Sequence, residues 1–174
     1  MPALYAQPDF PGLDTEQLAT ATAFNWPLLA PRWLPADCQG KFLDYPGGGA
    51  ALQYQCGDDS LPYSVDISVQ PGFLSVQFDP ELRLKKHQTL NPWLGPLSWY
   101  QLRSTLQPDQ CYYGLDPVLP PRPTRVKLPG FDASPLYYSM LVSAPEQLPP
   151  AAVIDRILAS LDWLNPPAEK GDAR

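Results

Sequence analysis

Proline is the residue that most restricts what this chain can fold into. Twenty-four of its 174 residues are proline, whereas the ordinary share is about 5%, and they are spread along the whole chain. Each proline fixes φ and removes a backbone N–H donor, so long helices and uninterrupted central strands are confined to the few segments without proline. The sequence therefore predicts short regular elements joined by long proline-rich loops.

The remaining composition is that of a chain that folds. Hydrophobic residues make up 44% and charged residues 17%, which supplies enough apolar surface to offset the entropy of ordering the backbone. The net charge of -6 disfavours a phosphate backbone, which needs several cationic contacts. We therefore expect no nucleic-acid partner.

The chain is expected to form one domain with an N-terminal arm and a flexible C-terminal tail. We assign residues 1–13 to an N-terminal arm, 14–165 to a single α+β domain and 166–174 to a flexible tail. No segment approaches the roughly 18 apolar residues of a membrane span, and no basic segment followed by an apolar run marks the N-terminus. The expectation is a soluble protein, cytoplasmic as written, and envelope or secreted if the sequence is a trimmed mature form.

Two helices are predicted near the ends of the domain. Asp14 can cap a short helix over residues 15–21 through its carboxylate. The second helix begins with Pro149 and Pro150 in its first turn and ends at Asn165. Its apolar residues recur at helical spacing and form one stripe suited to packing on a sheet: Ile154, Ile157, Leu158, Leu161 and Leu164.

Two hairpins are predicted between Cys38 and Asp79. In the first, the turn Pro46–Gly49 joins strands 41–45 and 50–55 and places Cys38 opposite Cys56. The second turns at Pro71–Gly72. Pairing across that turn puts six apolar side chains on one face, as the pairs Val65 with Phe78, Ile67 with Val76, and Val69 with Leu74.

Later strands are expected at 98–102, 111–115 and 135–143, whereas the rest of 80–130 gives no clear pattern. The fold class that follows is α+β: an antiparallel β-sheet built from hairpins, packed against a C-terminal amphipathic helix, with long proline-rich loops.

The three cysteines do not have the spacing of a zinc site, and a single histidine cannot complete one. Cys38 and Cys56 are placed as cross-strand neighbours, so either a disulfide or two reduced, half-buried thiols fits. Cys111 is then left over, and a small buried hydrophobe is favoured there over a reactive thiol.

Two polar segments suit loops better than sites. His87 lies in the cationic cluster 83–88, which fits either a patch for an acidic partner or lipid headgroups, or a solvated strand end. Asp58 and Asp59 lack the alternating ligands of a calcium loop and fit a turn. No phosphate-binding glycine loop, serine elbow or zinc-protease helix is present, so no catalytic, cofactor or metal residue is assigned.

Aromatic residues give the remaining functional signal. Trp93, Trp99 and Tyr100 fall within a loop-rich stretch. Exposed there, they would form a partner surface; the alternative is that they cover the core where regular structure is sparse.

The order of elements resembles two known groups. Leu34-Pro35 ahead of the strands, the segment Ile67-Ser68-Val69 and the closing segment 157–161 are similar to the small extracytoplasmic domains of bacterial anti-sigma-factor-like proteins and to PsbP-like accessory domains. The chain has Ala36-Asp37 where the first group shows Glu-Gly. The resemblance implies an accessory module and carries over no functional residue.

The sequence thus leads to a non-enzymatic protein-binding or accessory domain of a bacterial-type protein, with another protein as partner and no cofactor. The first alternative is a small-ligand or lipid carrier with a cavity between sheet and helix of at least roughly 300 Å³. The second is an enzyme whose site is assembled from separate loops, using Asp58, Asp59 or Cys111 with His87.

Overall fold

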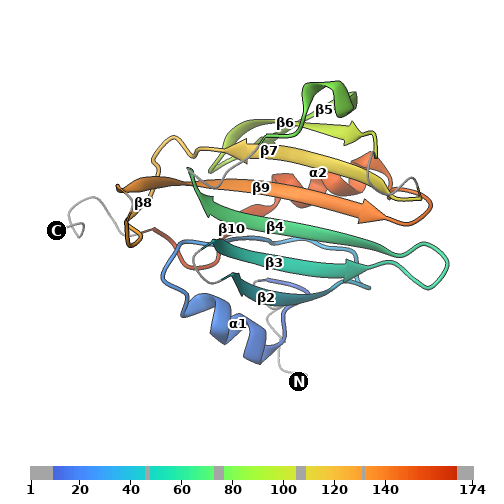
Figure 1. The fold of residues 1–174 in the computed structure, drawn as a ribbon. Coiled ribbons are helices and arrows are strands. Elements are labelled where there is room, and N and C mark those ends of the chain that lie inside the picture. Colours follow the sequence, from blue (N-terminus) through green and yellow to red (C-terminus); the bar gives the residue numbers. More distant parts are fainter. Residues whose placement is uncertain (1–9, 46–47, 73–76, 105–108, 131, 168–174) are drawn as a thin grey trace, which may run out of the picture.

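The structure is a computed structural model that describes residues 10–45, 48–72, 77–104, 109–130 and 132–167. Figure 1 shows one broad antiparallel sheet with short helices beside and behind it. The elements in chain order are α1 (Thr15–Thr22), β1 (Leu29–Pro31), β2 (Gln39–Tyr45), β3 (Gly49–Cys56), β4 (Tyr63–Pro71), the 3-10 helix η2 (Pro80–Leu82), β5 (Arg83–Asn91), β6 (Gly95–Leu102), β7 (Cys111–Val118), β8 (Arg125–Val126), β9 (Ser134–Ala144), α2 (Ala151–Ala159) and β10 (Leu161–Trp163).

The sheet has the spatial order β2-β3-β4-β9-β7-β6-β5, and the short β8 pairs with one end of β9. β1 and β10 form a separate two-stranded ribbon. The expected α+β class is confirmed, with an antiparallel sheet and a C-terminal helix. The strands expected at 98–102, 111–115 and 135–143 are β6, β7 and β9, and β9 lies at the centre of the sheet.

One face of the sheet carries the core. Every second residue of β4 and β9 is buried, and these side chains pack with α2, β1 and the segment before α1. In Figure 1, α2 and β10 lie behind the sheet. The expected burial of Val65, Ile67 and Val69 on this face is confirmed, as is that of Ile157 and Leu161. The opposite face of β3, β4, β9 and β7 we call the open face, because neither α1 nor α2 packs on it.

The first helix and the first hairpin are confirmed. The Asp14 carboxylate accepts a hydrogen bond of 2.8 Å from the backbone N–H of Gln17, which fixes the start of α1. Strands β2 and β3 pair in the expected register, with Gln39 opposite Gln55, although Pro46 and Gly47 of the turn lie outside the described residues.

The second predicted hairpin is wrong. Strand β4 pairs with β3 on one edge and with β9 on the other, so Val65 lies opposite Tyr54 and Val142. A strand has only two edges, and both are occupied, so the chain after Pro71 cannot fold back onto β4. Phe78 instead lies against β7. The two other predicted partners, Leu74 and Val76, are outside the described residues.

The C-terminal helix is shorter than expected. It ends at Ala159, and the next residues form β10, which pairs with β1. Leu161 and Leu164 are still buried, because a short strand against β1 directs apolar side chains into the same core as a longer helix would. Phe10 and Leu13, assigned to the N-terminal arm, also join this core.

Candidate functional site: a groove on the open face

The open face holds a groove of about 660 Å³. The sheet is hollowed here because three small residues lie side by side in register and form the floor of the groove: Ala51 of β3, Ser68 of β4 and Ser139 of β9. Larger side chains surround this floor. The lining residues are Tyr45, Gly48, Ala51, Asp66, Ser68, Gln70, Phe78, Pro117, Ser139, Met140 and Leu141.

Two serines provide hydrogen-bonding groups on the groove floor. The hydroxyl oxygens of Ser68 and Ser139 are 2.7 Å apart and share one hydrogen bond. Because each hydroxyl has one donor and two acceptor positions, the pair retains capacity to bind an occupant. The same arrangement recurs outside the groove, beyond the intervening pair of Asp66 and Leu141, where the hydroxyl oxygens of Ser64 and Ser143 are also 2.7 Å apart.

Asp66 is the acidic residue that lines the groove. One carboxylate oxygen, Oδ1, is buried without a hydrogen-bond partner among the described residues. Burial raises the pKa of the Asp66 carboxyl above its ordinary value, and the side-chain hydrogen bond from Gln53 and the charge of Lys41 oppose that rise. The folded chain thus holds a carboxylate where its charge is unfavourable.

One wall of the groove depends on Phe78. Its ring lies over Gly114 of β7, where a Cβ atom would come within 2.5 Å of Phe78 Cε2 and 2.7 Å of Leu102 Cδ1. The backbone N–H of Phe78 donates a 2.8 Å hydrogen bond to Asp116 Oδ1, and the other oxygen of Asp116 pairs with Arg83. Glycine at position 114 is therefore required for this aromatic wall to approach the sheet.

The proposed partner surface is divided by the fold. Trp93 lies in the turn between β5 and β6 and is 46% exposed. Tyr100 is half-buried on the open side of β6, where the guanidinium of Arg83 stacks 4.6 Å from its ring centroid. Trp99 is 1% exposed, so its assignment to a partner surface is corrected: adjacent strand residues point to opposite faces, and Trp99 points into the core.

Trp99 organises the core beneath β5. His87 stacks on it with ring centroids 4.3 Å apart. The indole N–H of Trp99 donates a hydrogen bond to Thr89 Oγ1 at 2.9 Å. The Thr89 hydroxyl in turn donates to the carboxylate of Asp155 in α2. Burial lowers the pKa of the His87 imidazole, Lys85 lowers it further and Asp155 opposes both.

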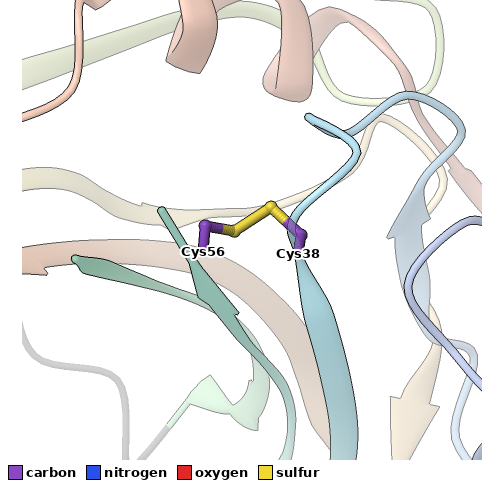
Figure 2. Close-up of a disulfide and its surroundings, with 2 residues drawn as sticks. All are labelled: Cys38 and Cys56. Atoms are coloured by element: carbon purple, nitrogen blue, oxygen red, sulfur yellow. A yellow bond between two sulfur atoms is a disulfide. The ribbon is translucent and has the colours of Figure 1, made fainter. Parts of the chain in front are cut away.

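The structure contains the disulfide between Cys38 and Cys56, which lie side by side in Figure 2, Cys38 directly before β2 and Cys56 at the end of β3. Both residues are buried. Cys111 is a free, half-buried thiol whose sulfur lies 3.5 Å from the carbonyl oxygen of Glu146. None of the hydrogen bonds or ring contacts of the described residues joins Cys111 to His87.

Asp58 organises a turn between β3 and β4. Its carboxylate accepts hydrogen bonds from the Ser60 hydroxyl and from the backbone N–H groups of Ser60 and Leu61. These hydrogen bonds lower the pKa of the Asp58 carboxyl, and the bond from the Ser60 hydroxyl has the largest effect. Asp59 lines a separate small pocket of about 110 Å³ with Glu146.

The groove was not found from the sequence. A signal was present, since serines occur four residues apart in both β4 and β9, on the polar side of each strand. That spacing became informative only once the two strands were known to be neighbours.

Within the described ranges, no three potential metal ligands of the histidine, cysteine, aspartate and glutamate types come together, and none of the helices has the length and apolar character needed to span a membrane. Comparisons of the chain with protein-family models, with curated proteins and with solved structures found no match.

Proposed function

We propose that this protein is a non-enzymatic binding domain that holds an extended segment of another protein in the open-face groove. The observation that carries the proposal is the groove itself: a sheet face without a covering helix, with a floor of small residues and rims formed by Tyr45 and Phe78. Aromatic side chains at a rim supply large contact areas at little entropic cost, as in many protein interfaces.

The polar groups in the groove favour a peptide as occupant. Ser68, Ser139 and Gln70 offer both donors and acceptors, which match the alternating N–H and C=O groups of an extended backbone. The groove volume also lies within the range of small-molecule sites, roughly 300–1,000 Å³. A small apolar molecule is therefore the competing occupant that the experiment must separate.

An oxidising compartment is part of this proposal. Disulfides persist mainly in secreted, periplasmic and extracellular proteins, and the bond between Cys38 and Cys56 is buried within a hairpin of the main sheet. We infer that the domain works outside the reducing cytosol.

Asp66→Asn is expected to stabilise the fold while changing the groove. Because the folded-state pKa of Asp66 is raised, the carboxylate is unfavourable above that pKa, and the penalty disappears as the pH falls through it. The gain in unfolding midpoint should thus be largest at pH 7 and shrink towards about pH 4. Urea titrations at both values, with the exposed Asp44→Asn as control, test this; a gain that grows on acidification contradicts it.

The binding proposal is tested with a groove-filling substitution. Peptides selected from a displayed library of random twelve-residue sequences against the wild-type protein should bind Ser139→Phe at least about tenfold more weakly, since the ring occupies the floor. The matched control is Ser143→Phe, on the same strand and the same face but outside the groove. It should keep the wild-type affinity.

Two outcomes would contradict the proposal. Equal weakening by both phenylalanine substitutions would place the selected peptides away from the groove. A small molecule that co-purifies with the wild-type protein, is seen by native mass spectrometry and is lost in Ser139→Phe would identify the groove as a ligand carrier's site instead.

A further inference from the structure

The two outer strands of the sheet, β2 and β5, differ in how their outer edges are covered. At β2, the backbone N–H of Gly40 donates to the Gly12 carbonyl at 2.7 Å, and that of Phe42 donates to the side-chain oxygen of Gln17 at 2.7 Å. The segment before α1 and α1 itself therefore cover that edge. An unpaired strand edge can pair with a strand of another molecule. The segment before α1 and α1 prevent this at the β2 edge, which is one of the two outer edges of the sheet.

At the other edge, β5 is nine residues long, and within the part of the chain that the structure describes it pairs with β6 alone. Among the described residues, no backbone hydrogen bond joins positions 84–90 on the outer side of β5 to another strand. Its position is nevertheless firm, because the Asn91 side chain donates to the carbonyls of Leu158 and Leu161 at 2.8 and 3.1 Å. The strand is thus held in place by α2 and the start of β10, while its outer edge has no partner strand among the described residues.

The charge on this edge is opposite to that of the whole chain. Lys85 and Lys86 are both exposed, and neither forms an ion pair with a described residue, whereas Arg83 is paired with Asp116. The net charge of the chain is -6. Asp155 of α2 is also hydrogen-bonded to this strand, through Thr89. Because charges farther apart than roughly 8 Å are screened at physiological salt, a partner strand along residues 84–88 meets Lys85 and Lys86 rather than the acidic residues elsewhere in the chain.

We propose that the outer edge of β5 pairs with an extended acidic strand of a partner protein. Addition of a strand to an open sheet edge is a common mode of recognition, in which backbone hydrogen bonds give affinity and alternate side chains give specificity. Acidic side chains next to Lys85 and Lys86 form favourable cross-strand pairs. Leu84 and Leu90, 52% and 72% exposed, offer apolar contacts towards the two ends of the strand.

A second copy of this chain is a less favourable partner for the β5 edge than an acidic strand. Pairing β5 with itself brings two lysines from each copy into one short ladder, where like charges repel. Edge lysines are also a common device against self-pairing. The same two residues therefore disfavour a homodimer and favour an acidic strand.

The proposal is tested with synthetic nine-residue peptides. A valine-rich peptide with two adjacent central glutamates, which point to opposite faces as Lys85 and Lys86 do, should bind the wild-type protein and protect the amides of residues 83–91 from hydrogen exchange. Lys85→Glu with Lys86→Glu should weaken it about tenfold and should increase affinity for the valine–lysine peptide. Arg122→Glu with Lys127→Glu, an equal change in charge at exposed positions elsewhere, is the control and should change neither affinity.

A second probe separates strand pairing from simple charge attraction. N-methylation of alternate amides in the valine–glutamate peptide removes its ladder hydrogen bonds but keeps its charge, and it should abolish binding. Undiminished binding of the methylated peptide would overturn the proposal. So would self-association through β5 without peptide binding, or binding to phosphatidylglycerol vesicles that depends on Trp93 in place of peptide binding. Ser139→Phe should leave the β5 interaction intact, so this site and the groove can fail separately.

Discussion

Replacing Trp99 with alanine is expected to lower the free energy of unfolding by about 4 kcal/mol. The side chain is 1% exposed, lies against the rings of His87 and Tyr113, and donates to Thr89. The substitution removes this apolar contact area and leaves a cavity between β6 and α2. It also removes the donor that orients Thr89 towards Asp155. Since a domain of this kind is stable by about 5–15 kcal/mol, the variant should approach the limit of folding.

Urea unfolding followed by far-ultraviolet circular dichroism measures this loss without relying on tryptophan emission. Trp99→Phe should lose less, roughly 1–2 kcal/mol, because it keeps most of the apolar packing and loses the N–H. Trp93→Ala is the control for a half-exposed tryptophan and should cost well under half as much as Trp99→Ala. Equal costs at the two positions would contradict the packing described for β6.

Removing the disulfide has the second-largest expected effect. The double substitution Cys38→Ser with Cys56→Ser should lower the free energy of unfolding by about 3 kcal/mol, because a closed loop of this length restricts the unfolded chain by that amount. The sequence separation of the two cysteines is 18. Denaturant titrations of wild type and double variant give the difference directly.

The matched control is Cys111→Ser, which removes the free thiol and should leave the disulfide contribution unchanged. Alkylation of the unfolded protein provides an independent check: one thiol should react without reductant and three after reduction. Three reactive thiols without reductant would show that the bond is absent in the isolated protein.

The contribution of the sequence is clearest in β2, β3 and α1. Their turn and cap residues act within about twenty positions of the chain, so the register that places Cys38 near Cys56 follows from the glycine run and the alternation alone. The same local reasoning predicted the second hairpin wrongly. It paired Val65 with Phe78 because they are close in the chain, whereas β9, about seventy residues later, supplies the pairing through Val142.

The candidate sites show the same limit. Trp99 and Tyr100 are adjacent in the sequence, and only the sheet decides that one enters the core while the other stays on the open side. The groove floor depends on Ser68 and Ser139 meeting across two strands. The sequence placed a possible partner surface at Trp93, Trp99 and Tyr100, whereas the aromatic residues that line the groove are Tyr45 and Phe78.

The sequence alone determined the elements that depend on short-range chemistry: the capped helix, the hairpin that brings Cys38 next to Cys56, and the alternation that buries one side of β4. The tertiary structure decided which strands are neighbours, and with that the groove and the uncovered edge at β5. The physical reason is that a strand pattern specifies which side faces the core but not which other strand will satisfy its backbone hydrogen bonds. That choice is made by the packing of the whole sheet.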